Sequence, residues 1–340
     1  MPGHDIIVIG ASAGGVEALQ ALVGDLPPDL QAAVFVVLHL TPEGASFLRQ
    51  ILNRAGALPA ATAMRGEAII PGRIYVAPPD HHLLVEPGFV RVARGPKENR
   101  FRPAIDALFR SAAYAYGPRV VGVISTGMLD DGTAGLWAVK DRGGLAVVQD
   151  PLEAFAPAMP QSALRHVAVD ACVPLAKMGP TLAQFTREPA AAEGDYPVSK
   201  KLAIETRIAR ADQRLDTGLL EVGELSPYTC PEWHGSLVRL RDGDITRFRC
   251  HTGHAFSMNS LLAEVSESLE TSLWNTQRAL NESRLLPRHL AHHARDRGED
   301  GLAERAEPKA RNAEQSAQIL RDLLARQDGL SEDQLRRQTG

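Results

Sequence analysis

Short runs of apolar residues alternate with amphipathic, helix-like stretches through the first 188 residues of the chain. Strands that are apolar throughout and are joined by helices are typical of a parallel sheet covered on both faces. The pattern therefore predicts an open, doubly wound, mostly parallel α/β domain over residues 1–188. The expected strands are 6–10, 33–40, 73–78, 120–126 and 145–150, the expected helices are 15–23, 44–56, 103–116 and 132–142, and a hairpin is expected over 83–95.

The pattern changes after residue 188. Residues 189–224 contain few bulky apolar side chains, which predicts a linker with at most a short helix. Residues 225–257 read as a β-hairpin, because Asp242-Gly243 is a tight-turn pair between two strand-like runs. From 258 to 335, leucines at helical spacing predict a helical hairpin or short coiled-coil tail, with Pro287 interrupting the first helix.

Composition narrows the class of protein. At 340 residues the chain has room for about two domains. A net charge of -4 gives no electrostatic argument for binding nucleic acid or an anionic membrane surface. Three cysteines are too few for a disulfide scaffold, and Gly10 and Ser12 interrupt the first apolar run, which argues against a signal peptide. We therefore expect a cytoplasmic protein that is not inserted in a membrane, of undefined oligomeric state.

A glycine-rich turn, "GASAGG" at 10–15, joins the first expected strand to its helix. The dinucleotide-binding fingerprint requires glycine at the third position, where Ser12 stands, and an acid where the next strand ends in His39. The turn instead matches G-x-S-x-G, through Gly10, Ser12 and Gly14. That pattern exposes a serine hydroxyl on a sharp turn between strand and helix. Ser12 is therefore a candidate nucleophile.

A serine nucleophile needs a base and a group that orients the base. His39 closes the second expected strand, and Asp130 and Asp131 follow the strand at 120–126. Each has an ordinary structural explanation, since aspartate before a helix is a favoured N-cap. However, the carboxyl ends of neighbouring parallel strands meet at one edge of the sheet, so these side chains are expected to lie together. The amide of Ala13, at a helix N-terminus, would favour an oxyanion.

Five motifs extend this picture: "IGASAGG", "HLTP", "GRIYVAPPDHHL", "NRFRPAIDALF" and "TGMLDDGTAGL". In order and spacing they resemble the CheB-type protein-glutamate methylesterases of bacterial chemotaxis, over residues 4 to about 185. The resemblance implies that Ser12 is the nucleophile, His39 the base and Asp131 the residue that orients the base. It also implies oxyanion contacts from the backbone amide of Met128, beside the amide of the residue after Ser12.

The resemblance further implies a substrate and an activity. The expected reaction is hydrolysis of glutamate methyl esters on methylated chemoreceptors, with deamidation of receptor glutamine as a second activity and no cofactor for catalysis. Ala13 stands where many family members have threonine, and Leu129 where many have glycine. The chemotaxis enzymes carry a receiver domain before the esterase, which we do not expect here because the first strand starts at residue 6. The alternative function is a non-catalytic signalling adaptor, which would have no physical need for all three catalytic side chains.

The hairpin segment carries two C-x3-H pairs. Pairing outward from the expected turn sets Cys250 opposite Gly235, which gathers both pairs at one end of the hairpin. Two sulfurs and two imidazoles suit tetrahedral Zn²⁺, so we expect a structural zinc site. Similar tails in some CheB-like proteins carry "CPxC"; here Trp233 replaces the second cysteine, and His234 or His251 is left to substitute. The expected ligands are Cys230, His234, Cys250 and His254.

The alternative for this hairpin is a pair of reduced cysteines packed on the esterase domain without metal. The third cysteine, Cys172 in "VDACVPL", is expected to be a buried apolar residue rather than a nucleophile.

Overall fold

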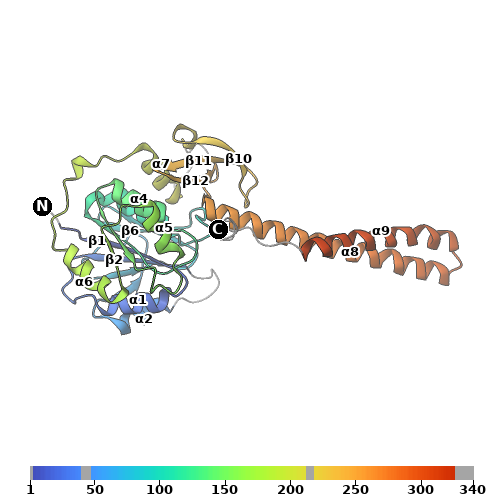
Figure 1. The fold of residues 1–340 in the computed structure, drawn as a ribbon, viewed down its shortest axis with the longest axis horizontal. Coiled ribbons are helices and arrows are strands. Elements are labelled where there is room, and N and C mark those ends of the chain that lie inside the picture. Colours follow the sequence, from blue (N-terminus) through green and yellow to red (C-terminus); the bar gives the residue numbers. More distant parts are fainter. Residues whose placement is uncertain (1–2, 40–46, 212–217, 326–340) are drawn as a thin grey trace. The chain divides into compact units, whose positions relative to one another are not determined.

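A seven-stranded sheet forms the centre of the first of two compact units (Figure 1). The computed structural model describes residues 3–39, 47–211 and 218–325, and the chain divides into two compact units after Leu261. The strand order is β3-β4-β2-β1-β7-β8-β9, and every pairing is parallel, which confirms the predicted doubly wound fold. The strands are β1 (Ile6–Ala11), β2 (Ala33–Leu38), β3 (Ala60–Thr62), β4 (Ile74–Val76), β7 (Val120–Ile124), β8 (Leu145–Gln149) and β9 (Ala171–Val173).

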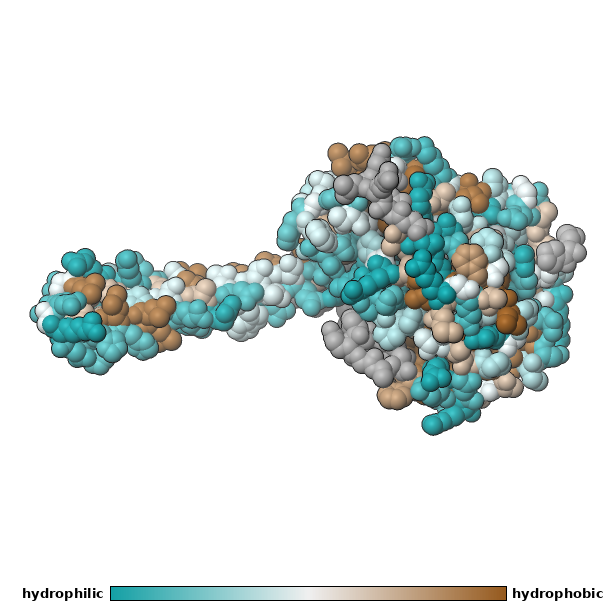
Figure 2. All heavy atoms as spheres, turned by 180° about the vertical axis from the view of Figure 1, so that it is seen from behind, coloured by the Kyte–Doolittle hydropathy of each residue, from teal (hydrophilic) through white to brown (hydrophobic). Residues whose placement is uncertain are grey.

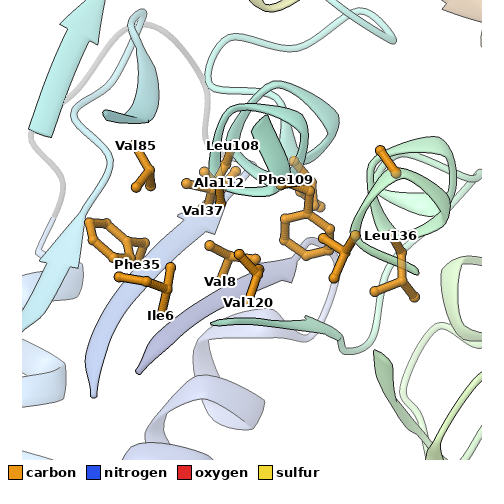
Figure 3. Close-up of a cluster of buried hydrophobic side chains, with 14 of the residues drawn as sticks. Ile6, Val8, Phe35, Val37, Val85, Leu108, Phe109, Ala112, Val120 and Leu136 are labelled. Carbon is orange, nitrogen blue, oxygen red and sulfur yellow. The ribbon is translucent and has the colours of Figure 1, made fainter. Parts of the chain in front are cut away.

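Helices cover both faces of this sheet. Because side chains alternate along a strand, Ile7 and Ile9 of β1 pack on the face covered by α1, α2 and α6, whereas Ile6 and Val8 pack on the opposite face with α3, α4 and α5 (Figure 3). Burial on both sides explains why the strands are apolar throughout. The helices are α1 (Gly15–Gly24), α2 (Leu48–Ala55), α3 (Ile105–Tyr116), α4 (Thr133–Asp141), α5 (Ala158–His166) and α6 (Leu175–Phe185), and a short 3-10 helix spans Gly117–Arg119.

The expected hairpin at 83–95 is also present. Strands β5 (His82–Glu86) and β6 (Phe89–Ala93) form a separate two-stranded antiparallel sheet. Leu83, Val85 and Val90 from this hairpin join the core of α3. The hairpin therefore covers the outer side of the helix whose N-terminus faces the candidate site.

The segment expected to be a linker contains a packed helix. Helix α7 (Lys200–Ala209) contacts α3, and Leu202, Ile204 and Glu205 are buried. The Ser199 hydroxyl accepts a hydrogen bond from the Leu202 amide at 3.2 Å, which caps the helix N-terminus. Residues 200–209 are thus part of the first unit. Short 3-10 helices at Glu193–Asp195 and Leu219–Glu221 flank this helix.

The expected two-stranded metal hairpin is part of a four-stranded antiparallel sheet in the order β10-β11-β12-β13. Its turn is formed by Gly243 and Asp244, one position later than expected, because glycine with φ +59 takes the first turn position. As a result Cys250 lies opposite Leu237 and not opposite Gly235, so the predicted register was wrong. The strands are β10 (Glu224–Thr229), β11 (Ser236–Asp242), β12 (Ile245–Cys250) and β13 (Ala255–Ser257).

The second unit is a pair of antiparallel helices, α8 (Met258–Asp296) and α9 (Asp300–Leu324). The helical tail was predicted, but the break at Pro287 was wrong, because α8 continues through Pro287 and the chain reverses at 297–299. Near Pro287, the Glu314 carboxylate of α9 accepts hydrogen bonds from Arg284 at 2.9 Å and Arg288 at 3.3 Å. These bonds join the two helices beside the position where proline removes one backbone donor. The helices meet along a seam of small side chains: Ala291, Ala294, Ala303 and Ala306.

Apolar side chains on this helical pair also reach the surface (Figure 2). Leu286 of α8 and Ile319 of α9 are both more than half exposed. In the described part of the chain, neither these helices nor any other is both long and apolar enough to span a bilayer.

Candidate active site

Three side chains from three strand-to-helix connections meet at one edge of the large sheet. Gly10 of β1 pairs with Val37 of β2 and with Ile124 of β7, so the carboxyl ends of these strands lie side by side. His39 Nδ1 lies 3.1 Å from Ser12 Oγ, and His39 Nε2 lies 2.8 Å from Asp131 Oδ2. The structure thus brings together all three residues proposed for the chemistry.

The glycines of the Ser12 turn are required by close packing. A Cβ at Gly10 would lie 2.3 Å from a methyl carbon of Ile105, and Gly14 has φ +73 at the N-cap of α1. The Ser12 amide donates to the Thr126 carbonyl at 2.9 Å, which fixes the turn against β7. The G-x-S-x-G spacing therefore reflects a turn that only glycine fits on either side of the serine.

The Asp131 carboxylate accepts four hydrogen bonds. Oδ2 accepts from His39 Nε2 and from the Ile105 amide at 2.7 Å, and Oδ1 accepts from Asn99 Nδ2 at 2.8 Å and the Asp106 amide at 3.3 Å. Burial acts to raise the pKa of Asp131, but its bonds to His39, Asn99 and the Ile105 amide outweigh burial and hold that pKa below its ordinary value. Because Ile105 begins α3, the carboxylate caps α3 rather than its own following helix.

These bonds indicate which ring nitrogen of His39 carries the hydrogen that Asp131 receives. An ionised carboxylate can only accept, so His39 Nε2 carries the hydrogen that Asp131 receives. Nδ1 then presents its lone pair to the Ser12 hydroxyl, as a base requires. Phe101 stacks on the imidazole, with 3.6 Å between ring centroids and 7° between planes, which holds the ring in this orientation.

Ala13 lies in the turn between β1 and α1, and Met128 lies in the connection between β7 and α4. Within the described residues, no protein acceptor takes either N–H, which leaves both free to donate to a developing oxyanion. The connection after β7 runs against the nucleophile, because a Cβ at Gly127 would lie 2.9 Å from Ser12 Cβ. Thr126 Oγ1 donates to the Ala13 carbonyl at 2.8 Å and joins the two loops.

Asn99 links the site to the C-terminal sheet, a role that the sequence did not indicate beyond its place in "NRFRPAID". Its amide nitrogen donates to both Asp131 and Asp106, and its Oδ1 accepts from the Ser257 amide at 2.8 Å and the Ser260 hydroxyl at 3.1 Å. Burial and the neighbouring Asp131 carboxylate raise the pKa of Asp106 to about 7. Asn99 is therefore shared by two buried acids, by the end of β13 and by the first turn of α8.

A chain of buried charges runs from α3 into the C-terminal sheet. Glu98 pairs with Arg110 of α3 and, at 3.0 Å, with Arg249 of β12. Arg249 also lies 3.0 Å from Glu205 of α7, which Arg247 contacts at 2.7 Å. Burial would raise the pKa of Glu98, but Arg110 and Arg249 outweigh it and lower that pKa to about 2. The network ties β12 and α7 to α3, the helix that Asp131 caps.

Three of the four predicted metal ligands converge. The donor atoms of Cys230, Cys250 and His254 all lie within 4.8 Å of one another, and the three residues are buried. His234 does not join this group and is exposed, with φ +56 in the loop before β11. Cys172 is exposed, so the expectation of a buried thiol was wrong, because it lies on the partly exposed edge strand β9.

The fold and the Ser-His-Asp arrangement define this chain as an α/β protein with the catalytic geometry of a serine hydrolase. The sequence model described as "CheB methylesterase" matches residues 7–182. The catalytic domain of the Thermotoga maritima CheB methylesterase is similar in structure, with a TM-score of 0.52 and 32% identity over 54% of this chain and 99% of that domain. The chain belongs to the CheB methylesterase family.

Relatives with curated names support this assignment. A Leptospira interrogans protein named putative protein-glutamate methylesterase/protein-glutamine glutaminase is 38% identical over 52% of this chain and 91% of its own length. The Methanosarcina mazei protein-glutamate methylesterase/protein-glutamine glutaminase 2 is 35% identical over 54% of this chain and 52% of its length. A Xanthomonas campestris protein of that name, numbered 1, is 39% identical over 52% of this chain and 50% of its length. This chain therefore spans about half the length of the last two.

Proposed function

We propose that this chain is a protein-glutamate methylesterase that hydrolyses glutamate methyl esters on helical, chemoreceptor-type proteins. The observation that carries the proposal is the bonded series from Ser12 Oγ through His39 to Asp131, at 3.1 and 2.8 Å. A serine, a base with a free lone pair and a buried carboxylate in this order are what ester hydrolysis through an acyl-enzyme needs. The names of the relatives support the choice of ester.

The reaction would proceed in two steps. In the first, His39 Nδ1 takes the Ser12 proton while Oγ attacks the ester carbonyl, and Asp131 stabilises the imidazolium that forms. The amides of Ala13 and Met128 would donate to the oxyanion, and His39 returns the proton to the departing methoxide as methanol leaves. In the second, His39 deprotonates a water that attacks the acyl-serine, which releases glutamate and restores Ser12.

The same groups would deamidate receptor glutamine. An amide carbonyl accepts the Ser12 attack in the same way, and the proton from His39 then goes to the nitrogen so that ammonia leaves. The water step is unchanged. The word glutaminase in the names of the relatives supports this second activity.

Exposed apolar side chains lie beside the nucleophile and suit the surface of a substrate helix. Phe155 is 82% exposed and packs against Gly14, where an added Cβ would lie 2.6 Å from Phe155 Cβ. Met128, in the connection after β7, is 59% exposed. Because the cysteines in the described part of the chain form no disulfide, the proposal places this reaction in the cytoplasm.

Methanol release from a methylated receptor fragment tests this function. The Ser12→Ala protein is expected to lose release by at least a thousandfold, while Ser272→Ala, which alters an exposed serine of α8, is expected to match the unmodified protein. A fluorophosphonate probe should label Ser12 only when His39 is present. Undiminished methanol release from the Ser12→Ala protein would remove Ser12 from the mechanism, whereas no release from the unmodified protein would favour the non-catalytic adaptor.

A further inference from the structure

The cysteine and histidine cluster of the C-terminal sheet has the dimensions of a zinc site. His254 Nδ1 lies 3.6 Å from Cys250 Sγ and 3.9 Å from Cys230 Sγ. Tetrahedral zinc, bound to sulfur at about 2.3 Å and to nitrogen at about 2.0 Å, places these atoms about 3.6 Å apart. The three donors are therefore already spaced as ligands around one centre.

Groups around the cluster suit bound metal as well. Glu232 Oε2 lies 3.7 Å from His254 Nε2, the ring nitrogen that faces away from the sulfurs. Thr252 Oγ1 lies 2.9 Å from Cys250 Sγ, where a hydroxyl can donate to a thiolate. Ligating histidines commonly present their second nitrogen to a carboxylate in this way, which fixes the tautomer that binds metal.

The sheet around the cluster has a small core in which the two thiols take a large share. So few apolar side chains bury little surface, and a bound ion would add to the folding stability of this sheet, as in other small metal-bound modules. The core consists of Cys230, Leu237, Phe248, Cys250, Phe256 and Leu261.

One short strand connects this cluster to the catalytic carboxylate. His254 immediately precedes β13. The Ala255 carbonyl of β13 accepts a hydrogen bond from the backbone N–H of Asn99 at 2.8 Å. Two residues later, the Ser257 amide donates to Asn99 Oδ1 at 2.8 Å. Asn99 Nδ2 in turn donates to Asp131 at 2.8 Å. The position of β13 therefore orients the side-chain amide of Asn99, which donates to Asp131.

We propose that Cys230, Cys250 and His254 bind one zinc ion, with water as the fourth ligand, and that this ion holds β13 in the position that directs Asn99 to Asp131. The argument for zinc binding at these three residues does not depend on the proposed esterase function. The effect of the ion on activity rests on the proposed function.

The metal is tested on the full chain without an activity measurement. The protein as purified is expected to hold one zinc per chain, and its cobalt-substituted form is expected to show thiolate-to-cobalt charge-transfer absorption. Both should be lost in Cys230→Ser and Cys250→Ser and kept in the matched control Cys172→Ser, which removes an exposed thiol. Reduced protein without metal, a disulfide between Cys230 and Cys250, or loss of zinc in His234→Ala would each overturn this three-ligand site.

The coupling is tested by removing and restoring zinc. Hydrogen exchange of residues 97–101 is expected to accelerate at least tenfold when zinc is chelated and to recover when zinc is returned, while protection in β1 stays unchanged. Methanol release is expected to fall at least tenfold and recover in parallel. Unchanged exchange at 97–101 would refute the coupling. Zinc-loaded protein that releases no methanol would refute the proposed function alone, since exchange still reports the link.

Discussion

Removing the side-chain amide of Asn99 is expected to weaken catalysis through Asp131. Asn99 donates one of the four hydrogen bonds that this buried carboxylate accepts. A hydrogen bond to an ionised group contributes about 1.5–3 kcal/mol, and 1.36 kcal/mol corresponds to a factor of ten or one pKa unit. The loss should therefore reduce kcat/KM about 10- to 100-fold and raise the pKa of Asp131.

The choice of variant follows from the backbone. Asn99 has φ +49, a conformation that asparagine tolerates and that alanine adopts at a cost. Asn99→Gly removes the amide without that strain, so it isolates the hydrogen bonds better than Asn99→Ala. A matched control is Asn53→Gly, which removes an amide bonded to the Ala60 carbonyl at 2.6 Å, away from Asp131.

The assay is methanol release as a function of pH. Because a less stabilised carboxylate binds a proton more readily, the acid-side decline in kcat/KM should move to higher pH in Asn99→Gly. Asn53→Gly should lower the unfolding temperature and leave the pH profile in place. If Asn99→Gly keeps kcat/KM within about twofold of the unmodified protein and its acid limb does not move, Asn99 does not position Asp131.

Three further outcomes are expected. Leu129 has φ +60, so Leu129→Gly should raise the free energy of unfolding by about 1 kcal/mol, and an unchanged denaturant midpoint would contradict the strain. Phe155→Ala should raise KM for methylated receptor several-fold with little change in kcat, whereas a fall in kcat alone would argue against a contact with bound substrate. The pKa of Glu98 is lowered to about 2 from its ordinary 4.5, so its stabilisation is complete above pH 4.5 and is lost as pH falls toward 2. Glu98→Gln should flatten that part of the stability curve, and an unaltered slope would show that Arg110 and Arg249 do not act through this carboxylate.

Local sequence patterns predicted the centre of the fold because each central strand is buried on both faces. Residues 6–11 show this, since Ile7 and Ile9 enter one core and Ile6 and Val8 the other, which requires an uninterrupted apolar run. Strands β3 and β9 were not predicted, because they are three residues long and partly exposed, and their side chains carry no comparable pattern.

The candidate site was predictable where its residues follow strands. Ser12 and His39 directly follow β1 and β2, and Asp131 lies in the connection that follows β7, so the sheet topology brings them to one edge. Asn99 follows no strand of that sheet. It reaches Asp131 through a loop held by Ser257, which is 158 residues away in the chain, and no local pattern encodes that contact.

The C-terminal sheet shows why such contacts escape sequence analysis and still fix the structure. In "ITRFRC", Arg247 and Arg249 alternate with other residues, as they would on a strand with one solvent-exposed face. However, both arginines are at most 2% exposed. Each is buried because acids from elsewhere neutralise it: Glu205 contacts both, and Glu98 contacts Arg249. Removing one partner of a buried ion pair costs about 3–5 kcal/mol, so a displaced sheet would leave several charges unpaired. A purely apolar interface would tolerate a shift of the sheet against α3 and α7 far better than this network of buried charges does. The sheet is therefore held in one position, which is the condition for Ser257 to reach Asn99, the side chain that supports the Asp131 carboxylate.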